Sequence, residues 1–327
     1  MIMNKNIFKF RVKEIAYGWC HVNLIINNKE IDYYASSVLG DSPVDSFIEA
    51  CADFISLDTD GTYYITWYDE PGTLKFDLSL DESQMLHMDI RKYEDEDDSN
   101  LEEEWHEVIP YDCFVNEVIS EGFRVLRAFG LYGYRCSWQN QTDFPLASLL
   151  RITKKCYRVW NGDSCYSDIS KEIECLQEFL PKASTIDKVV KMDECVVYYE
   201  SWQIQCCGDP FAVGDTVEWT CVYPSLTKHA HGILIDCDEE HHIGDTHKVR
   251  GTISKIIVER SEFPKGKREV WYESAGVIHE EVQKADGWES ELKDDETTER
   301  TFWGYIVTLK DAEITPIDKS KLPSKPD

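Results

Sequence analysis

Apolar and polar residues alternate with a period of two along much of the first 110 residues. This period predicts strands that bury one face and expose the other. Turn signals such as Asn27-Asn28 and Glu70-Pro71-Gly72 separate the alternating segments, which indicates an antiparallel meander. The expected strands cover residues 7–15, 19–26, 31–35, 63–68, 74–80, 85–93 and 107–110.

Two segments of this region have helical spacing instead. Asp41-Ser42-Pro43 is a typical helix start, and apolar residues at helical spacing continue to Ile55. A second apolar stripe predicts a helix over residues 112–129, with Gly130 placed to end it. The expected fold class is therefore α+β, with an N-terminal two-layer arrangement of antiparallel sheet and helices.

The C-terminal part is rich in strand-forming residues and predicts a second fold. A Gly214-Asp215 turn leads into a strand, and Gly251 lies inside another. Both features are typical of the bent strands of a small SH3-like or OB-like β-barrel. The strands are expected at residues 195–199, 211–219, 249–258 and 302–310, with a mobile acidic loop at residues 280–300.

Charge divides the chain into three parts. Its 62 acidic and 34 basic residues give a net charge of −28. Residues 1–150 contribute −17, residues 151–195 contribute zero and residues 196–327 contribute −11. We therefore expect an acidic α+β domain (1–150), a connector with a short helix (151–195) and a small β-barrel domain (196–327).

The negative charge and the apolar pattern limit the partners. Phosphate backbones and anionic membranes repel so acidic a chain, whereas basic proteins are attracted to it. No apolar run approaches the roughly 18 residues of a membrane-spanning helix, and the first residues lack a secretory signal. We expect a cytoplasmic protein whose 12 cysteines, none in a C-x-x-C pair, are free thiols.

The strongest local signal is the acidic run at residues 94–104, which holds eight carboxylates in eleven residues. One interpretation is a solvated, disordered loop between two strands. The other is an electrostatic lure for a basic partner, with neighbouring aromatic side chains as anchors. The candidate partner-binding residues are Tyr93, Glu94, Asp95, Glu96, Asp97, Asp98, Glu102, Glu103, Glu104 and Trp105.

Cysteine, histidine and acidic residues gather within about forty positions of the C-terminal part. Thiol and imidazole ligands suit zinc, and His229 and His231 would lie on one side of a strand. Adjacent Cys206 and Cys207 would point to opposite faces of an extended chain, so only one could bind. The candidate zinc ligands are Cys206, Cys221, His229 and His231. The alternatives are a buried cysteine beside Trp219 and a solvated loop rich in histidine and acidic residues.

Several sequence motifs of common enzyme classes are missing. The chain contains no G-x-x-x-x-G-K-[ST] phosphate loop, no G-x-G-x-x-G fingerprint, no H-E-x-x-H pair and no G-x-S-x-G elbow. Nucleotide hydrolases, dinucleotide enzymes and common metalloproteases are therefore disfavoured.

Two stretches carry a resemblance to known families. Residues 202–219 read W-Q-I-Q-C-C-G-D-P-F-A-V-G-D-T-V-E-W, which resembles an uncharacterised bacterial domain family over residues 195–315. The W-Y-D-E-P-G turn at residues 67–72 is similar to that of acidic, immunity-protein-like domains of Bacillus-type bacteria. The first resemblance implies no activity, and the second implies an immunity role in a toxin system.

These observations favour a binding protein over an enzyme. We expect an acidic, immunity-like or inhibitor-like protein that neutralises a basic partner, such as a toxin, a nuclease or a defence factor. A narrower version has the acidic run mimic nucleic acid. The alternative is a metal-dependent enzyme that uses the C-terminal Cys/His cluster, with zinc as its cofactor. Direct binding of nucleic acid is disfavoured by the charge.

Overall fold

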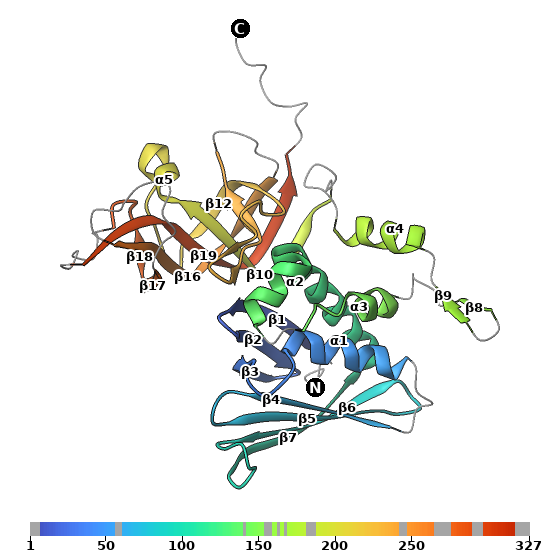
Figure 1. Ribbon diagram of the computed structural model, residues 1–327. Coiled ribbons are helices and arrows are strands. Elements are labelled where there is room, and N and C mark those ends of the chain that lie inside the picture. Colours follow the sequence, from blue (N-terminus) through green and yellow to red (C-terminus); the bar gives the residue numbers. More distant parts are fainter. Residues whose placement is uncertain are drawn as a thin grey trace, which may run out of the picture. The chain divides into compact units, whose positions relative to one another are not determined.

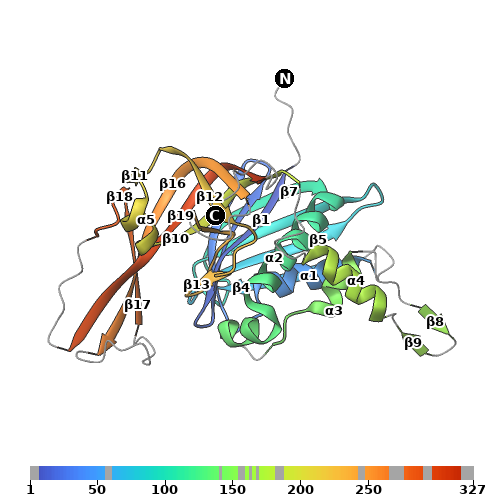
Figure 2. The same ribbon diagram turned by 90° about the horizontal axis from the view of Figure 1, so that it is seen from above.

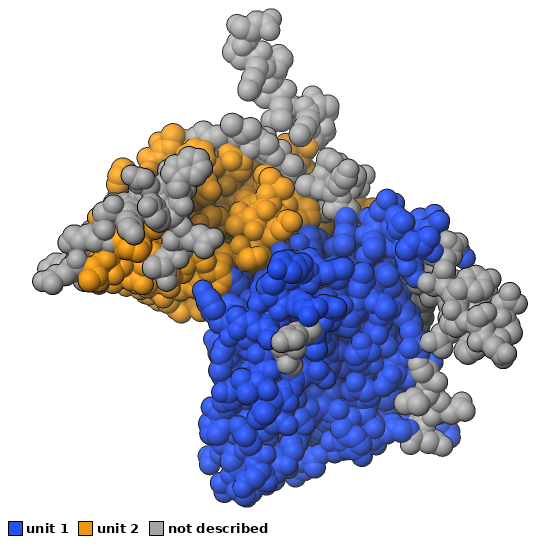
Figure 3. Space-filling view, viewed as in Figure 1, with its two compact units in different colours: residues 1–180, 232–234 blue, residues 181–231, 235–327 orange. Residues whose placement is uncertain are grey.

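The chain folds into two compact units, which Figure 3 shows in different colours. Unit 1 comprises residues 1–180 and 232–234, and unit 2 comprises residues 181–231 and 235–327. The division falls within the segment for which the sequence predicts a connector. The computed structural model describes residues 7–55, 61–139, 142–153, 159–161, 164–166, 169–180, 188–241, 247–264, 276–289 and 297–317.

Unit 1 contains two antiparallel sheets, as the alternating segments predict. In the first sheet, β1 (Phe8–Ala16), β2 (Trp19–Ile26) and β3 (Lys29–Ser36) form a meander, and β14 (Ile233–Leu234) pairs with β1. The second sheet has the order β4 (Thr62–Tyr68), β5 (Thr73–Leu80), β6 (Met85–Tyr93) and β7 (Leu101–Pro110). Strand β7 is therefore an edge strand.

The helices of unit 1 are α1 (Pro43–Phe54), α2 (Tyr111–Trp138), α3 (Leu146–Ile152) and α4 (Ile169–Phe179). Figures 1 and 2 show α1, α2 and α3 together on one side of the strands. Ser42 caps α1, since its hydroxyl accepts a hydrogen bond from the Asp45 amide at 3.0 Å. A short hairpin, β8 (Val159–Asn161) and β9 (Ser164–Tyr166), precedes α4. The predicted α+β class is confirmed.

Phe47 of α1 lies at the centre of the unit 1 core. Its ring contacts aromatic rings of both sheets and of α2 at centroid distances of 5.1–6.0 Å, within the range of favourable aromatic pairs. The partners are Phe10 and Trp67 at 5.1 Å, Phe114 at 5.2 Å, Phe76 at 5.6 Å and Phe8 at 6.0 Å. The helical stripe and both meanders therefore share one core.

The prediction that Gly130 ends the second helix is wrong. Gly130 has non-helical backbone angles (φ 65°, ψ −174°), but helical turns resume after it and continue to Trp138. Glycine adopts this positive φ without a steric cost, so it allows a break without a stop. The residues after the break place Tyr134 and Trp138, both fully buried, in the core.

Unit 2 is built around two long antiparallel strands, β16 (His247–Pro264) and β19 (Thr298–Pro316), which run side by side in Figure 1. The sheet order is β12 (Thr216–Val222), β15 (Cys237–Glu239), β10 (Val190–Glu200), β19, β16 and β17 (Gly276–Val282). Because β12 also pairs with β16, five strands form a ring of hydrogen-bonded neighbours. Short strands β11 (Phe211–Ala212), β13 (His229–Ala230) and β18 (Lys284–Ala285) complete the unit.

Two expectations for unit 2 are wrong. The segment expected to be a mobile loop contains the end of β17 and all of β18, whereas residues 290–296 lie outside the described part. Cys206 and Cys207, expected on an extended stretch of chain, lie in helix α5 (Ser201–Cys207). The helix changes the directions in which Cys206 and Cys207 point, because neighbours on a helix do not alternate between two faces.

Over the described residues, no helix combines the length and the apolar character needed to cross a membrane. The ten cysteines whose side chains the structure describes are all free thiols, which agrees with the prediction.

Candidate functional site

The acidic run lies on a well-formed hairpin of unit 1. We call β6, β7 and the seven-residue connection at residues 94–100 the acidic hairpin. Strand β7 begins at Leu101, six residues before the predicted start, so Glu102, Glu103 and Glu104 are strand residues. The prediction of a disordered loop is therefore wrong for this half of the run.

Hydrogen bonds also order the connection. The carboxylate of Asp95 accepts bonds from Ser99 Oγ at 2.7 Å, the Ser99 amide at 2.9 Å and Asn100 Nδ2 at 2.6 Å. The bond from the Ser99 hydroxyl is the largest of the effects that lower the pKa of Asp95 below its usual range. The carboxylate thus holds the turn in place rather than pointing free into solvent.

Lysines pair with some acidic residues of the hairpin. Lys29 Nζ lies 2.8 Å from Glu103 Oε2, Lys92 Nζ lies 2.8 Å from Glu102 Oε2, and Lys75 pairs with Asp98. Such exposed pairs contribute little to stability. Four further carboxylates, all exposed, have no ion pair among the described residues: Glu94, Glu96, Asp97 and Glu104.

The two candidate aromatic anchors are only partly exposed. Trp105 packs against the unit 1 core, and Lys29 Nζ lies 4.2 Å from the centroid of its ring. Lys75 Nζ lies 5.6 Å from the ring centroid of Tyr93. Both rings are therefore engaged by cations of the same chain, which shows that their faces attract positive groups.

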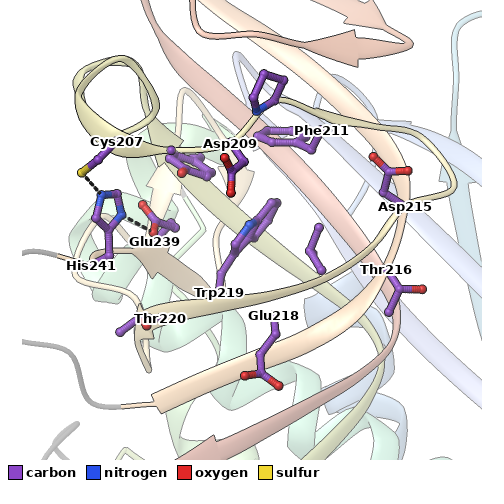
Figure 4. A pocket seen from close by; sticks show the side chains of 14 residues that line it. Cys207, Asp209, Phe211, Asp215, Thr216, Glu218, Trp219, Thr220, Glu239 and His241 are labelled. Atoms are coloured by element: carbon purple, nitrogen blue, oxygen red, sulfur yellow. Dashed lines mark hydrogen bonds and ion pairs between the residues drawn. The ribbon is translucent and has the colours of Figure 1, made fainter.

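Unit 2 contains a pocket with a volume of about 490 Å³. Strands β10 and β15 are parallel neighbours, so their carboxyl ends meet at one edge of the sheet. Helix α5 follows β10 at this edge and carries Cys207, whereas Glu239 ends β15 and His241 follows it. Figure 4 shows these three side chains at one end of the pocket, with Trp219 between them and Asp215.

The three side chains form a hydrogen-bonded line. Cys207 Sγ lies 3.0 Å from His241 Nε2, and His241 Nδ1 lies 2.7 Å from Glu239 Oε1. Cys207 is exposed, His241 is partly buried and Glu239 is buried, with 4% of its surface exposed. The order of exposure runs from the sulfur at the surface to the carboxylate inside.

Burial has a strong effect on the Glu239 carboxylate. It raises the pKa to about 6, despite the opposing effect of the bond from His241. Above pH 6 the group is ionised, so it accepts from Nδ1–H of His241. Its second oxygen, Oε2, is buried without a hydrogen-bond partner among the described residues. A buried carboxylate oxygen without a donor is costly, so Oε2 is available to accept a hydrogen bond from a donor in the pocket.

Close packing leaves no room for a side chain at Gly208, the glycine of the C-C-G sequence. A Cβ at this position would lie 2.5 Å from Tyr199 Oη and 2.6 Å from Ile204 Cα. We expect Gly208→Ala to lower the free energy of unfolding by about 1–3 kcal/mol through overpacking, measured by chemical denaturation. Gly133→Ala is the control, because its nearest contact would be 3.8 Å away. Equal stability of the two variants would contradict this account.

The four candidate zinc ligands are dispersed in the structure. Cys206 is exposed on α5, whereas Cys221 is fully buried on β12. His229 lies on β13, but His231 follows the strand in a turn with φ 46°, so the two histidines do not share a strand. Instead, Nε2 of His231 lies 4.0 Å from Oε1 of Glu259. Within the described ranges, no group of three or more His, Cys, Asp or Glu side chains is placed to hold a metal ion.

Residues 236–240, expected to be a solvated acidic loop, are instead held by hydrogen bonds. Asp236 Oδ2 accepts from the Val196 amide at 2.9 Å, and Asp238 accepts from the Leu226 and Thr227 amides and from Ser225 Oγ. These carboxylates fix a backbone turn. The sequence places Cys207 and His241 within one forty-residue region but does not indicate their pairing, because Cys206 and Cys207 are expected on an extended chain rather than on a helix. Position His242 lies outside the described residues.

Comparison with known proteins bears on unit 2 alone. Residues 193–311 match a family of unknown function, DUF6578. This match confirms the resemblance to an uncharacterised domain family, and it spans every residue of the pocket. No curated protein and no solved structure matches the chain. The immunity-like resemblance of the first 150 residues stays a prediction.

Proposed function

We propose that the protein binds and neutralises a basic partner protein, such as a toxin, a nuclease or a defence factor. The acidic hairpin is the contact surface in this proposal. The observation that supports it best is a group of four exposed carboxylates on an ordered hairpin that form no ion pair with any described residue: Glu94, Glu96, Asp97 and Glu104. Ordered charges lose less conformational entropy on binding than a disordered tail does.

Edge strand β7 supports the same role. Its Glu102–Glu104 segment is exposed at the end of a sheet, and its carboxylates lie next to those of residues 94–98 along the hairpin. A surface of one sign accelerates association with a partner of the opposite sign and selects against like-charged proteins. In the narrower version of the proposal, these carboxylates mimic the phosphates of a nucleic acid.

The proposal extends to the fold of unit 2, the resemblance of unit 1 and the cellular location. The ring of five paired strands in unit 2 supports a small barrel of the SH3-like or OB-like kind. The W-Y-D-E-P-G turn supports the immunity-like resemblance only weakly, since Trp67 is fully buried and serves the core. We place the action of the protein in the cytoplasm.

A charge-neutralised hairpin tests the proposal. The variant Glu94→Gln/Glu96→Gln/Asp97→Asn removes three exposed charges that form no ion pair in the described part of the chain. We expect it to weaken binding of a basic partner by about 10- to 100-fold at low salt. The partner is first recovered with tagged wild-type protein and identified by mass spectrometry, and binding to the purified partner is then measured.

A matched variant controls for total charge. Asp41→Asn/Glu82→Gln/Asp112→Asn removes the same charge from exposed positions of unit 1 outside the hairpin. We expect this control to bind as wild type does. Equal weakening in both triple variants, or in neither, would contradict a role for the hairpin.

A further inference from the structure

The pocket of unit 2 holds a thiol, an imidazole and a carboxylate in the order of a nucleophile, a base and an orienting group. The two contacts are 3.0 Å for Cys207 Sγ to His241 Nε2 and 2.7 Å for His241 Nδ1 to Glu239 Oε1. This arrangement is the general signature of an activated nucleophile. It needs no metal, and it lies in a pocket with room for a small ligand.

The hydrogen bonds fix the tautomer of His241. An ionised carboxylate can only accept, so Nδ1 of His241 carries the hydrogen that bonds to Glu239. Nε2 then has a free lone pair and accepts from the thiol. Desolvation, the Cys206 thiol and Glu239 raise the pKa of the Cys207 thiol. A thiol that keeps its proton needs a base in contact, and His241 is in that position.

The lining of the pocket indicates the charge of its ligand. Three aromatic side chains form one wall, with ring centroids 5.1–5.6 Å apart: Tyr199, Phe211 and Trp219. Four carboxylates also line it: Asp209, Asp215, Glu218 and Glu239. Of the described residues that line it, none is lysine or arginine, although Lys248 donates to Thr220 Oγ1 at 2.6 Å.

Aromatic faces and carboxylates together favour an organic cation. Oε2 of Glu239 has no hydrogen-bond donor among the described residues and belongs to a residue with 4% of its surface exposed, so it can accept a hydrogen bond from such a cation. An ammonium or guanidinium group supplies both the charge and the hydrogen.

We propose that Cys207, His241 and Glu239 form a metal-free thiol site that hydrolyses esters or thioesters whose acyl group carries a cationic side chain. Cys207 is the nucleophile, His241 is the general base and acid, and Glu239 orients His241. The inference does not rest on the proposed binding function of unit 1.

The first half of the reaction forms a thioester. The thiol proton moves from Cys207 Sγ to His241 Nε2, while the sulfur electron pair bonds to the carbonyl carbon. The carbonyl π pair moves to oxygen and then returns, which breaks the bond from carbon to the leaving group. The leaving group takes the proton from His241 and departs as an alcohol or thiol.

The second half restores the enzyme with water. His241 Nε2 removes a proton from water, and the resulting hydroxide bonds to the thioester carbon. The carbon–sulfur bond breaks, and Cys207 Sγ recovers its proton from His241. The sum is ester and water to carboxylic acid and alcohol, so no oxidant, reductant or further reactant is required.

Two matched esters test the activity and its charge selection. The probes are the Nα-protected p-nitrophenyl esters of lysine and norleucine, which differ in the side-chain ammonium group. We expect full-length protein to hydrolyse the lysine ester with a kcat/KM at least about tenfold higher. Equal values for the two esters would overturn the proposed charge selection, and rates no higher than those with a heat-denatured sample would overturn the activity.

Substitutions assign the roles. We expect Cys207→Ser and His241→Gln to lower kcat by about 100-fold or more, whereas Cys206→Ser retains wild-type kcat. For Glu239→Gln we expect a lower kcat for both esters, because Glu239 orients His241, and a higher KM for the lysine ester, because Oε2 of Glu239 accepts a hydrogen bond from its cationic group. Wild-type kcat in Cys207→Ser, or its loss in Cys206→Ser alone, would overturn the assignment.

Trapping the intermediate gives a readout that does not depend on turnover. We expect acid quenching during hydrolysis of the lysine ester, followed by peptide mass spectrometry, to show the acyl group on Cys207. His241→Gln should show a slower appearance of the same adduct. An acyl group found on Cys206 or on another residue, with none on Cys207, would overturn the proposal.

Discussion

Replacing Phe47 with alanine should lower the free energy of unfolding of unit 1 by about 3–5 kcal/mol. The side chain is fully buried, and its ring contacts five aromatic partners from α2 and from both sheets. Because these rings belong to different elements, the cavity cannot close without moving the sheets against the helices. Urea denaturation measures the loss, and hydrogen exchange of peptides from α1 assigns the transition to unit 1.

Tyr64→Ala is the matched control for this substitution. Tyr64 is also aromatic and lies in unit 1, but 72% of its surface is exposed. We expect its free energy of unfolding to stay within about 0.5 kcal/mol of wild type. A loss at Phe47 no greater than that at Tyr64 would show that the core is not organised around α1.

The second large effect is a pH dependence set by Asp45 in the first turn of α1. The side chain is 7% exposed, and Tyr134 Oη donates to its Oδ1 at 2.7 Å. Burial is the largest cause that raises its pKa to about 7. Since the folded-state pKa exceeds the unfolded value of about 3.9, the folded chain binds this proton more tightly. Stability from this group is present at low pH and falls as the pH rises through 7.

Asp45→Asn removes this titration and keeps the side-chain volume. Between pH 5 and pH 8, we expect the free energy of unfolding of wild type to fall by about 2–3 kcal/mol relative to Asp45→Asn. The comparison cancels the titration of the other acidic residues. Urea denaturation at the two pH values measures it. A difference between the two proteins that does not change with pH would contradict the raised pKa.

The alternation of apolar residues was sufficient to locate most of the unit 1 strands. Residues 19–26 and 85–93 match β2 and β6 at both ends, because each alternating segment is bounded by a turn. Strand β7 was predicted too short, because Glu102–Glu104 carry no apolar signal. Pairing with β6, including Lys92 opposite Glu103, extends it. Tertiary pairing here overrides local composition.

The candidate sites were predictable only in part. The acidic hairpin is visible in the sequence as a run of charges, but its order depends on Ser99 and Asn100 bonding to Asp95. The line from Cys207 to Glu239 was not predictable from spacing. Its members are 32 and 34 positions apart and meet because β10 and β15 pair in parallel, a contact that no local pattern reports.

Binding of a basic protein by the acidic hairpin, as we propose, can be tested directly. The dissociation constant of the purified partner tests it most directly when measured for wild type and both triple variants, at low salt and at about 0.5 M salt. We expect the Glu94→Gln/Glu96→Gln/Asp97→Asn variant alone to bind more weakly at low salt, and the three proteins to converge at high salt. Equal dissociation constants at low salt would contradict the claim.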